Sequence, residues 1–220
     1  MVQSLKVILW GEEIGRLAWD TRRRLSCFMY NPAFLKKGLN ISPLAAPVDG
    51  ARGLTPVWGE EAKIYQKLPA FLADSLPDAW GNQLFELWRQ QNHLSNAGIT
   101  PLDKLSFIGK RGMGALEFLP EVSRERKAEK IDIKSLAILA RRIFSERENA
   151  GILPEESVIM QSLFTVGTSA GGRQPKVIVA IKYGVAEHWI GRVENTIIDH
   201  LKSWGELEEM VPEICLLYTS

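Results

Sequence analysis

Cysteine and histidine are scarce in this sequence, which contains two cysteines and three histidines among 220 residues. The two cysteines, Cys27 and Cys215, are far apart and form no CxxC spacing, so the sequence supports neither a disulfide framework nor a zinc site. No apolar run approaches the roughly 18 residues that a membrane-spanning helix needs, and the first residues lack the apolar core of a signal peptide. These absences argue against export and membrane insertion, and we expect a cytoplasmic protein without a membrane partner.

An excess of charge of one sign is also missing, because 27 Lys and Arg residues stand against 26 Asp and Glu residues, for a net charge of +1. This balance gives the molecule no overall electrostatic attraction for nucleic acid, so we expect no direct nucleic-acid binding. Two basic runs, at residues 22–24 and 124–127, are local. We interpret both as solvated basic edges.

The first part of the chain predicts a small antiparallel sheet. Apolar, partly alternating runs at 6–10, 14–19 and 25–30 are separated by turn residues, which is the pattern of short strands joined by hairpins. Residues 38–59 are rich in proline and glycine, so we expect a long extended or looping connection there. A further strand is predicted at 115–119, after a glycine-containing turn.

Four helices are predicted from capping residues and apolar spacing. Asp78 can cap the first helix, which runs to about residue 91 and has one apolar face. That face consists of Trp80, Leu84, Leu87, Trp88 and Gln91. Thr100, Pro101 and Asp103 open the second helix with a cap, a first-turn proline and an acid three residues after the cap, and this helix should stop at Gly109. Two more helices are expected at 132–148 and from Pro154 to residue 166. Mixed rather than regularly alternating elements indicate the α+β class, with a domain boundary near residue 122.

The segment most informative for chemistry is the glycine-rich stretch 167–176, which lies between a predicted helix and the β-branched run 177–181. Gly171 and Gly172 would let backbone N–H groups approach a phosphate, while Arg173 and Lys176 add positive charge and Ser169 a hydroxyl. The spacing is that of neither a P-loop nor a dinucleotide-binding loop. From these residues alone, an ordinary glycine-rich hairpin is an equally good interpretation.

Three segments resemble the signatures of HipA-family serine/threonine protein kinases. They are FLADSLPDAWGN at 71–82, TPLDKLSFIGKRGMGALEF at 100–118 and VGTSAGGRQPK at 166–176, in the order in which the family has them. The resemblance implies a HipA-like N-terminal subdomain at 1–122, an antiparallel sheet with packed helices. It also implies that residues 123–220 begin a kinase-like N-lobe.

The resemblance further implies the toxin of a toxin–antitoxin pair, which phosphorylates a serine or threonine of a protein target with ATP and Mg²⁺. The family's phosphate loop matches Gly171, Gly172, Arg173, Gln174, Pro175 and Lys176. The serine that such kinases phosphorylate on themselves matches Ser169. The implied partners are a HipB-like DNA-binding antitoxin and a protein substrate such as an aminoacyl-tRNA synthetase.

The sequence departs from the family pattern near its end. Arg192 stands where the family has its nucleotide-holding lysine, and it replaces a compact ammonium with a planar guanidinium. Glu208 can match the acid that orients this lysine, with a solvated helix face as an equally good interpretation. No segment after residue 193 resembles the catalytic Asp or the metal-binding Asp of a kinase, so we assign no catalytic and no metal-binding residue. Residues 215–220 resemble translated sequencing-adapter read-through, and we expect a truncated reading frame. The alternative is a non-catalytic regulatory or interaction module of a split HipA-type system.

Overall fold

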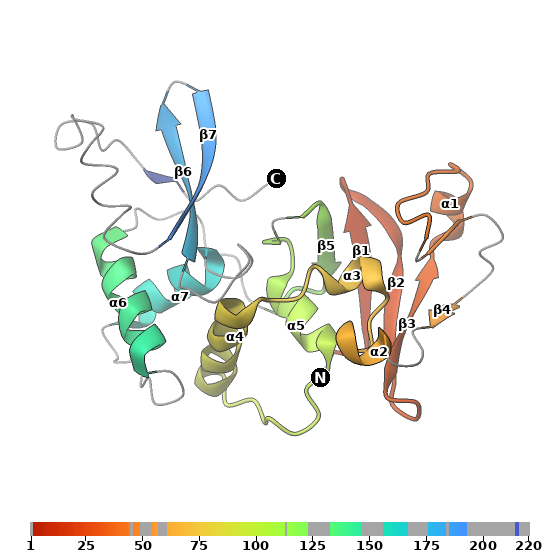
Figure 1. Ribbon diagram of the computed structural model, residues 1–220, viewed down its shortest axis with the longest axis horizontal. Coiled ribbons are helices and arrows are strands. Elements are labelled where there is room, and N and C mark those ends of the chain that lie inside the picture. The colour runs from red at the N-terminus through yellow and green to blue at the C-terminus, as the bar shows by residue number, and fades with distance from the viewer. Residues whose placement is uncertain are drawn as a thin grey trace. The chain divides into compact units, whose positions relative to one another are not determined.

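The computed structural model describes residues 2–44, 46–48, 54–56, 61–112, 114–122, 133–146, 156–166, 176–183, 185–192 and 214–215. The chain divides into two compact units, shown in Figure 1. The first unit comprises Met1–Leu76 and Ser95–Arg124, and the second comprises Pro77–Leu94 and Glu125–Ser220. Residues 77–94 therefore leave the first unit and belong to the second.

The first unit contains a five-stranded antiparallel sheet. Its strands are β1 (Ser4–Leu9), β2 (Glu12–Asp20), β3 (Leu25–Tyr30), β4 (Leu54–Pro56) and β5 (Leu116–Leu119), in the order β4-β3-β2-β1-β5. The hairpins β1–β2 and β2–β3 confirm the predicted sheet, while β5 returns from far along the chain to pair with β1. The α+β class is confirmed.

Two details of this sheet were not predicted from the sequence. Residues 54–56, which lie within the extended or looping connection predicted at 38–59, form the strand β4. Three residues ending in a proline carry no alternation, and their pairing with β3 is non-local; a proline is tolerated here because β4 is an edge strand. The first strand also ends at Leu9, because Trp10 (φ 50°) and Gly11 (φ 78°) form the tight turn into β2.

Four helices accompany this sheet: α1 (Pro32–Leu35), α2 (Glu61–Ile64), α3 (Ala70–Ala73) and α5 (Pro101–Ile108). The predicted start of α5 is confirmed, because the Asp103 carboxylate accepts hydrogen bonds from the backbone N–H of Thr100 (2.8 Å) and from its hydroxyl (2.9 Å). The same carboxylate accepts a 2.7 Å hydrogen bond from the N–H of Val2. Asp103 thus ties Val2, two residues before β1, to the first turn of α5.

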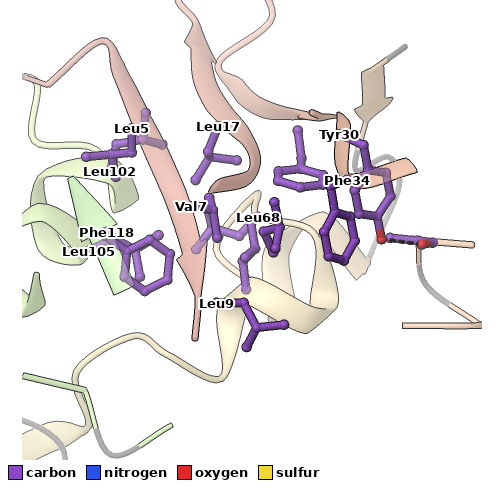
Figure 2. Close-up of a cluster of buried hydrophobic side chains, with 14 residues drawn as sticks. Leu5, Val7, Leu9, Leu17, Tyr30, Phe34, Leu68, Leu102, Leu105 and Phe118 are labelled. Atoms are coloured by element: carbon purple, nitrogen blue, oxygen red, sulfur yellow. Dashed lines mark hydrogen bonds between the residues drawn. The ribbon is translucent and has the colours of Figure 1, made fainter. Parts of the chain in front are cut away.

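The core of the first unit lies on one face of the sheet, as Figure 2 shows. Leu5, Val7 and Leu17 from the strands are fully buried, as are Leu68 and Leu102 from outside the sheet. An aromatic group extends this core: the Phe28 ring contacts the Tyr30 ring edge-on at 4.9 Å, and Tyr30 lies near Phe34. The Tyr30 hydroxyl donates a 2.6 Å hydrogen bond to the Ala46 carbonyl, and burial raises the pKa of this phenol. Gly15 is required beside this group, because a Cβ there would lie 2.5 Å from Phe28 Cζ and also meet the Met29 carbonyl oxygen.

In its described residues the second unit contains three helices, each where a helix was predicted, although the predicted start of the last one, Pro154, lies outside the described residues. They are α4 (Ala79–Gln91), α6 (Ile133–Glu146) and α7 (Ser157–Val166). The Asp78 carboxylate caps α4 by accepting a 2.7 Å hydrogen bond from the Gly81 N–H. The inward residues of α4 and α6 are buried as expected: Trp80, Leu84, Leu87, Trp88, Leu136, Leu139, Ala140 and Ile143.

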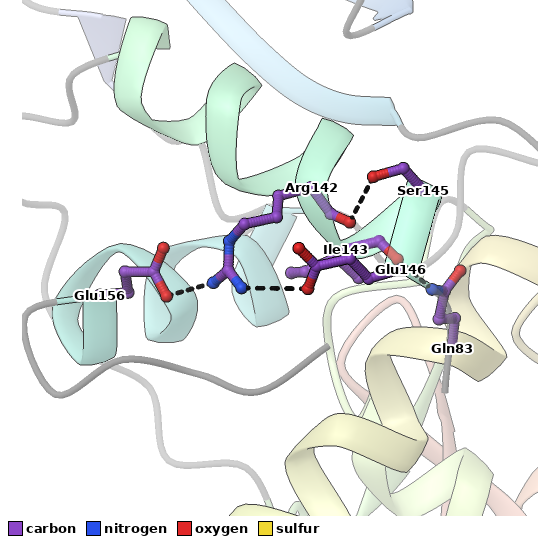
Figure 3. A network of polar contacts seen from close by, with 6 residues as sticks. All are labelled: Gln83, Arg142, Ile143, Ser145, Glu146 and Glu156. Carbon is purple, nitrogen blue, oxygen red and sulfur yellow. Dashed lines mark hydrogen bonds and ion pairs between the residues drawn. The ribbon is translucent and has the colours of Figure 1, made fainter. Parts of the chain in front are cut away.

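Polar contacts join these helices, as Figure 3 shows. Gln83 on α4 donates a 2.7 Å hydrogen bond to the Ile143 carbonyl in the last turn of α6, where no helical partner exists for that oxygen. Arg142 pairs with Glu146 on α6 at 3.3 Å and also with Glu156, next to the start of α7. The packing of α4 against α7 completes the helical layer. None of the helices in the described ranges is both long and apolar enough to cross a membrane.

Candidate nucleotide-binding site

The glycine-rich segment lies between a helix and a strand, and both of these flanking elements were predicted from the sequence. Helix α7 ends at Val166, and β6 (Lys176–Tyr183) begins ten residues later and contacts α7. Most of the predicted phosphate loop lies outside the described residues, namely Ser169, Gly171, Gly172, Arg173, Gln174 and Pro175. Of the predicted nucleotide-binding residues, the structure therefore places Lys176 and Arg192.

These two basic positions are register partners. Strand β6 forms an antiparallel hairpin with β7 (Val185–Arg192), in which Lys176 pairs with Arg192 at one end and Tyr183 with Val185 at the other. The short strand β8 (Ile214–Cys215) pairs with the opposite edge of β6 at Ala180 and Ile181. Lys176 therefore begins the central strand of a three-stranded sheet, at the end where the glycine-rich segment enters.

The electrostatics of this end of the hairpin differ from those of a P-loop. A P-loop precedes a helix and uses the partial positive charge of the helix N-terminus to hold phosphate. Here the loop follows α7, so the helix presents its C-terminus, which carries partial negative charge. Any attraction for phosphate must then come from loop N–H groups and from cations such as Lys176 and Arg192.

The two motifs at 71–82 and 100–118 hold structural residues in the described structure. Asp78 caps α4, and Asp103 accepts the hydrogen bond from the N–H of Thr100, the N-cap residue of α5, so both acids have the structural roles predicted for them. Burial raises the pKa of the Cys27 thiol, which disfavours the thiolate that a nucleophile needs. Within the described ranges, no group of three or more His, Cys, Asp or Glu residues is arranged to hold a metal ion.

One buried ion pair, between a residue of the second motif and a residue just beyond it, was not predicted from the sequence. The Arg111 guanidinium lies 3.0 Å from the Glu121 carboxylate, and both side chains are almost fully buried. Arg111 also donates a hydrogen bond to the Phe107 carbonyl and lies 5.1 Å from the centre of the Phe107 ring. The two partners are ten residues apart across a turn and a strand, a separation that no helical or strand period detects. The pair fixes the chain that leaves β5 against α5.

Comparison with known proteins identifies the first part of the chain. Residues 5–119 match the family model of the HipA N-terminal domain, which covers β1 through β5. No curated protein matches the chain. The matched region includes the sheet, both capped helices and the two motifs at 71–82 and 100–118. Because the match spans more than half of the 220 residues, the chain belongs to the HipA family of toxins.

Proposed function

We propose that this chain is the N-terminal part of a HipA-like kinase that transfers phosphate from ATP to a serine or threonine of a protein. The observation that carries the proposal is the order of parts along the chain. A HipA N-terminal domain at 5–119 is followed by a helix, a glycine-rich connection and a hairpin that opens with Lys176 opposite Arg192. Two cations at the entrance of such a loop suit a nucleotide's phosphates.

In this proposal the chain's own residues bind and orient the nucleotide. Gly171 and Gly172 leave room for loop N–H groups to donate to phosphate oxygens, and Lys176 and Arg192 offset phosphate charge from the two strands of the hairpin. Mg²⁺, when bound, would supply positive charge that offsets the charge of the phosphates. The catalytic Asp and the metal-binding acids would come from residues that we do not find in this chain.

The experiment compares ATP binding by the protein expressed from the complete gene with binding by Lys176→Ala and Arg192→Ala variants. Each substitution removes a charge-assisted hydrogen bond, worth about 1.5–3 kcal/mol, so the ATP dissociation constant should rise roughly 10- to 100-fold. Lys182→Ala is the matched control, since Lys182 lies on the same strand but pairs with Ala186 near the turn. Equal losses in all three variants, measured by calorimetry, would contradict a phosphate site at the open end of the hairpin.

The partners belong to the proposal as well. We propose that a HipB-like DNA-binding antitoxin binds this protein in the cytoplasm and that the substrate is a protein of translation, such as an aminoacyl-tRNA synthetase. The alternative function is a non-catalytic regulatory module. It is supported by the extent of the family match, which ends at residue 119 and does not reach the glycine-rich segment. A complete gene product that binds its antitoxin but neither binds ATP nor transfers labelled phosphate would establish the alternative.

A further inference from the structure

The turn between β2 and β3 presents three consecutive arginines to solvent. Arg22, Arg23 and Arg24 are all exposed, at the end of the hairpin that Figure 1 shows in the first unit. The turn is held in one conformation, because the Asp20 carboxylate accepts hydrogen bonds from the N–H of Arg22 (2.9 Å) and of Arg23 (3.0 Å). Arg24 has a positive φ of 53°, a backbone conformation that arginine adopts only at an energetic cost.

A fourth cation comes from a distant part of the chain. The Lys67 carbonyl accepts hydrogen bonds from the N–H (3.0 Å) and the hydroxyl (2.5 Å) of Ser26, two residues after Arg24. These hydrogen bonds hold the Lys67 backbone beside β3, and Lys67 has a positive φ of 65°. We call Arg22, Arg23, Arg24 and Lys67 the basic turn.

The charge of the basic turn is only partly balanced. Asp20 is 3.8 Å from Arg23, and its carboxylate already accepts the two backbone hydrogen bonds. Within the part of the chain that the structure describes, no carboxylate pairs with Arg22, Arg24 or Lys67. Positive charge therefore collects at one end of a sheet although the chain as a whole is nearly neutral.

The surroundings of the basic turn select among anionic ligands. A single small phosphate would need converging N–H groups, and those of Arg22 and Arg23 are already bonded to Asp20. A folded protein partner would need an apolar or aromatic anchor, and residues 21–24 are a threonine and three arginines. A single nucleic-acid strand would need an exposed aromatic platform, but Trp19, the aromatic closest in sequence to the three arginines, is half-buried against the core. A row of phosphates on a duplex needs only guanidinium groups.

We propose that the basic turn contacts the phosphate backbone of a double-stranded nucleic acid without reading its sequence. This inference goes beyond the proposed function and does not depend on it. It differs from the expectation drawn from net charge, because that expectation concerns long-range attraction of the whole molecule and the basic turn is a local patch. Few phosphates can be contacted, so binding by this surface is salt-dependent and adds to contacts made by other parts of a complex.

The test measures binding of a fluorescent mixed-sequence duplex to the 220-residue chain by anisotropy at several salt concentrations. The variant Arg22→Gln/Arg23→Gln/Arg24→Gln should bind about tenfold more weakly at low salt. The slope of log K against log salt should become shallower by roughly 2 to 3, since each phosphate contact contributes about 0.9. Replacing the three arginines by lysines keeps the charge and should keep the slope within about 1 of the parent.

The matched control removes three cations from elsewhere in the same unit, with Lys6→Gln/Arg16→Gln/Lys37→Gln. These residues already pair with Glu13, Glu13 and Glu12, so their loss should change duplex affinity by less than about threefold. Circular dichroism confirms that each variant is folded. The proposal is overturned if both triple variants lose affinity equally, if the parent does not bind, or if polyglutamate displaces the duplex at equal charge, which would indicate an acidic polypeptide instead.

Discussion

At the scale of single residues, Gly15 shows how closely the first unit is packed. Because a Cβ at this position would collide with the Phe28 ring and with the backbone carbonyl of Met29, neither of which can move freely, we expect Gly15→Ala to destabilise the protein. The expected loss in the free energy of unfolding is about 1–3 kcal/mol, measured by urea denaturation. Gly114→Ala is the control, since a Cβ there would meet nothing within 4 Å. A similar midpoint for the two variants would mean that the β2–β3 packing is looser than described.

A negative charge at Ser169 should weaken ATP binding, and this prediction is tested on the protein expressed from the complete gene. If the glycine-rich loop holds ATP phosphates, a phosphate on Ser169 adds roughly −1.5 to −2 charges at the place where the nucleotide binds. Ser169→Asp should therefore raise the ATP dissociation constant, whereas Ser169→Ala should leave the binding free energy within about 1 kcal/mol of the parent. Calorimetry decides between them, and equal affinities for the parent and Ser169→Asp would remove charge competition as a mechanism.

At the scale of elements, α4 depends on the burial of one face. Trp88 is 8% exposed, and its ring lies 6.0 Å from that of Phe85. Trp88→Ala removes a large buried side chain and should lower the free energy of unfolding by about 3–5 kcal/mol. Gln90, exposed on the same helix, provides the control, and Gln90→Ala should change stability by less than about 0.5 kcal/mol. If the Trp88 variant unfolds at the same denaturant concentration as the control, Trp88 lies at an interface rather than in a core.

Sequence reasoning found the elements that carry local signals. Helices α4 and α5 begin with side chains that accept hydrogen bonds from backbone N–H groups at the helix start, and these residue types can be recognised in the sequence. The hairpins of the first sheet join strands that are neighbours in the sequence. Elements without such signals were not predicted. Helices α1, α2 and α3 span four residues each and β4 spans three, which is too short for the helical or the strand spacing of apolar residues to be recognised. At the candidate site, the helix and strand flanking the loop were predicted. The register that brings Lys176 opposite Arg192 was not, since it depends on the length of the turn between β6 and β7.

At the scale of the whole molecule, the two units are not consecutive in the sequence. The predicted boundary near residue 122 stays a prediction, but a fragment ending there would contain α4 without α6 and α7. Its buried face, which holds Trp80, Leu84, Phe85, Leu87 and Trp88, would then lack the partners it has in the second unit. We expect residues 1–122 to bind a hydrophobic dye strongly and to aggregate.

The matched comparison replaces residues 77–94 of this fragment with a short Gly-Ser linker. Because the remaining residues contain the whole core of the first unit, the shortened fragment should stay monomeric and bind little dye. Size-exclusion chromatography with dye fluorescence measures both properties. Equal dye binding by the two fragments would show that the α4 face needs no cover from the second unit.

Because α4 lies between two parts of the first unit in the sequence but belongs to the second unit, it is synthesised well before its packing partners. Synthesis proceeds at about 5–20 residues per second, and α7 is completed roughly 75 residues after α4, so α4 emerges about 4–15 seconds before the helix it packs against exists. During that interval the first unit can complete its own sheet, because its last strand, β5, ends at Leu119. A nascent chain of this length carries a completed first sheet and a helix, α4, whose apolar face still lacks its partners. That face is the surface that we expect a chaperone to bind.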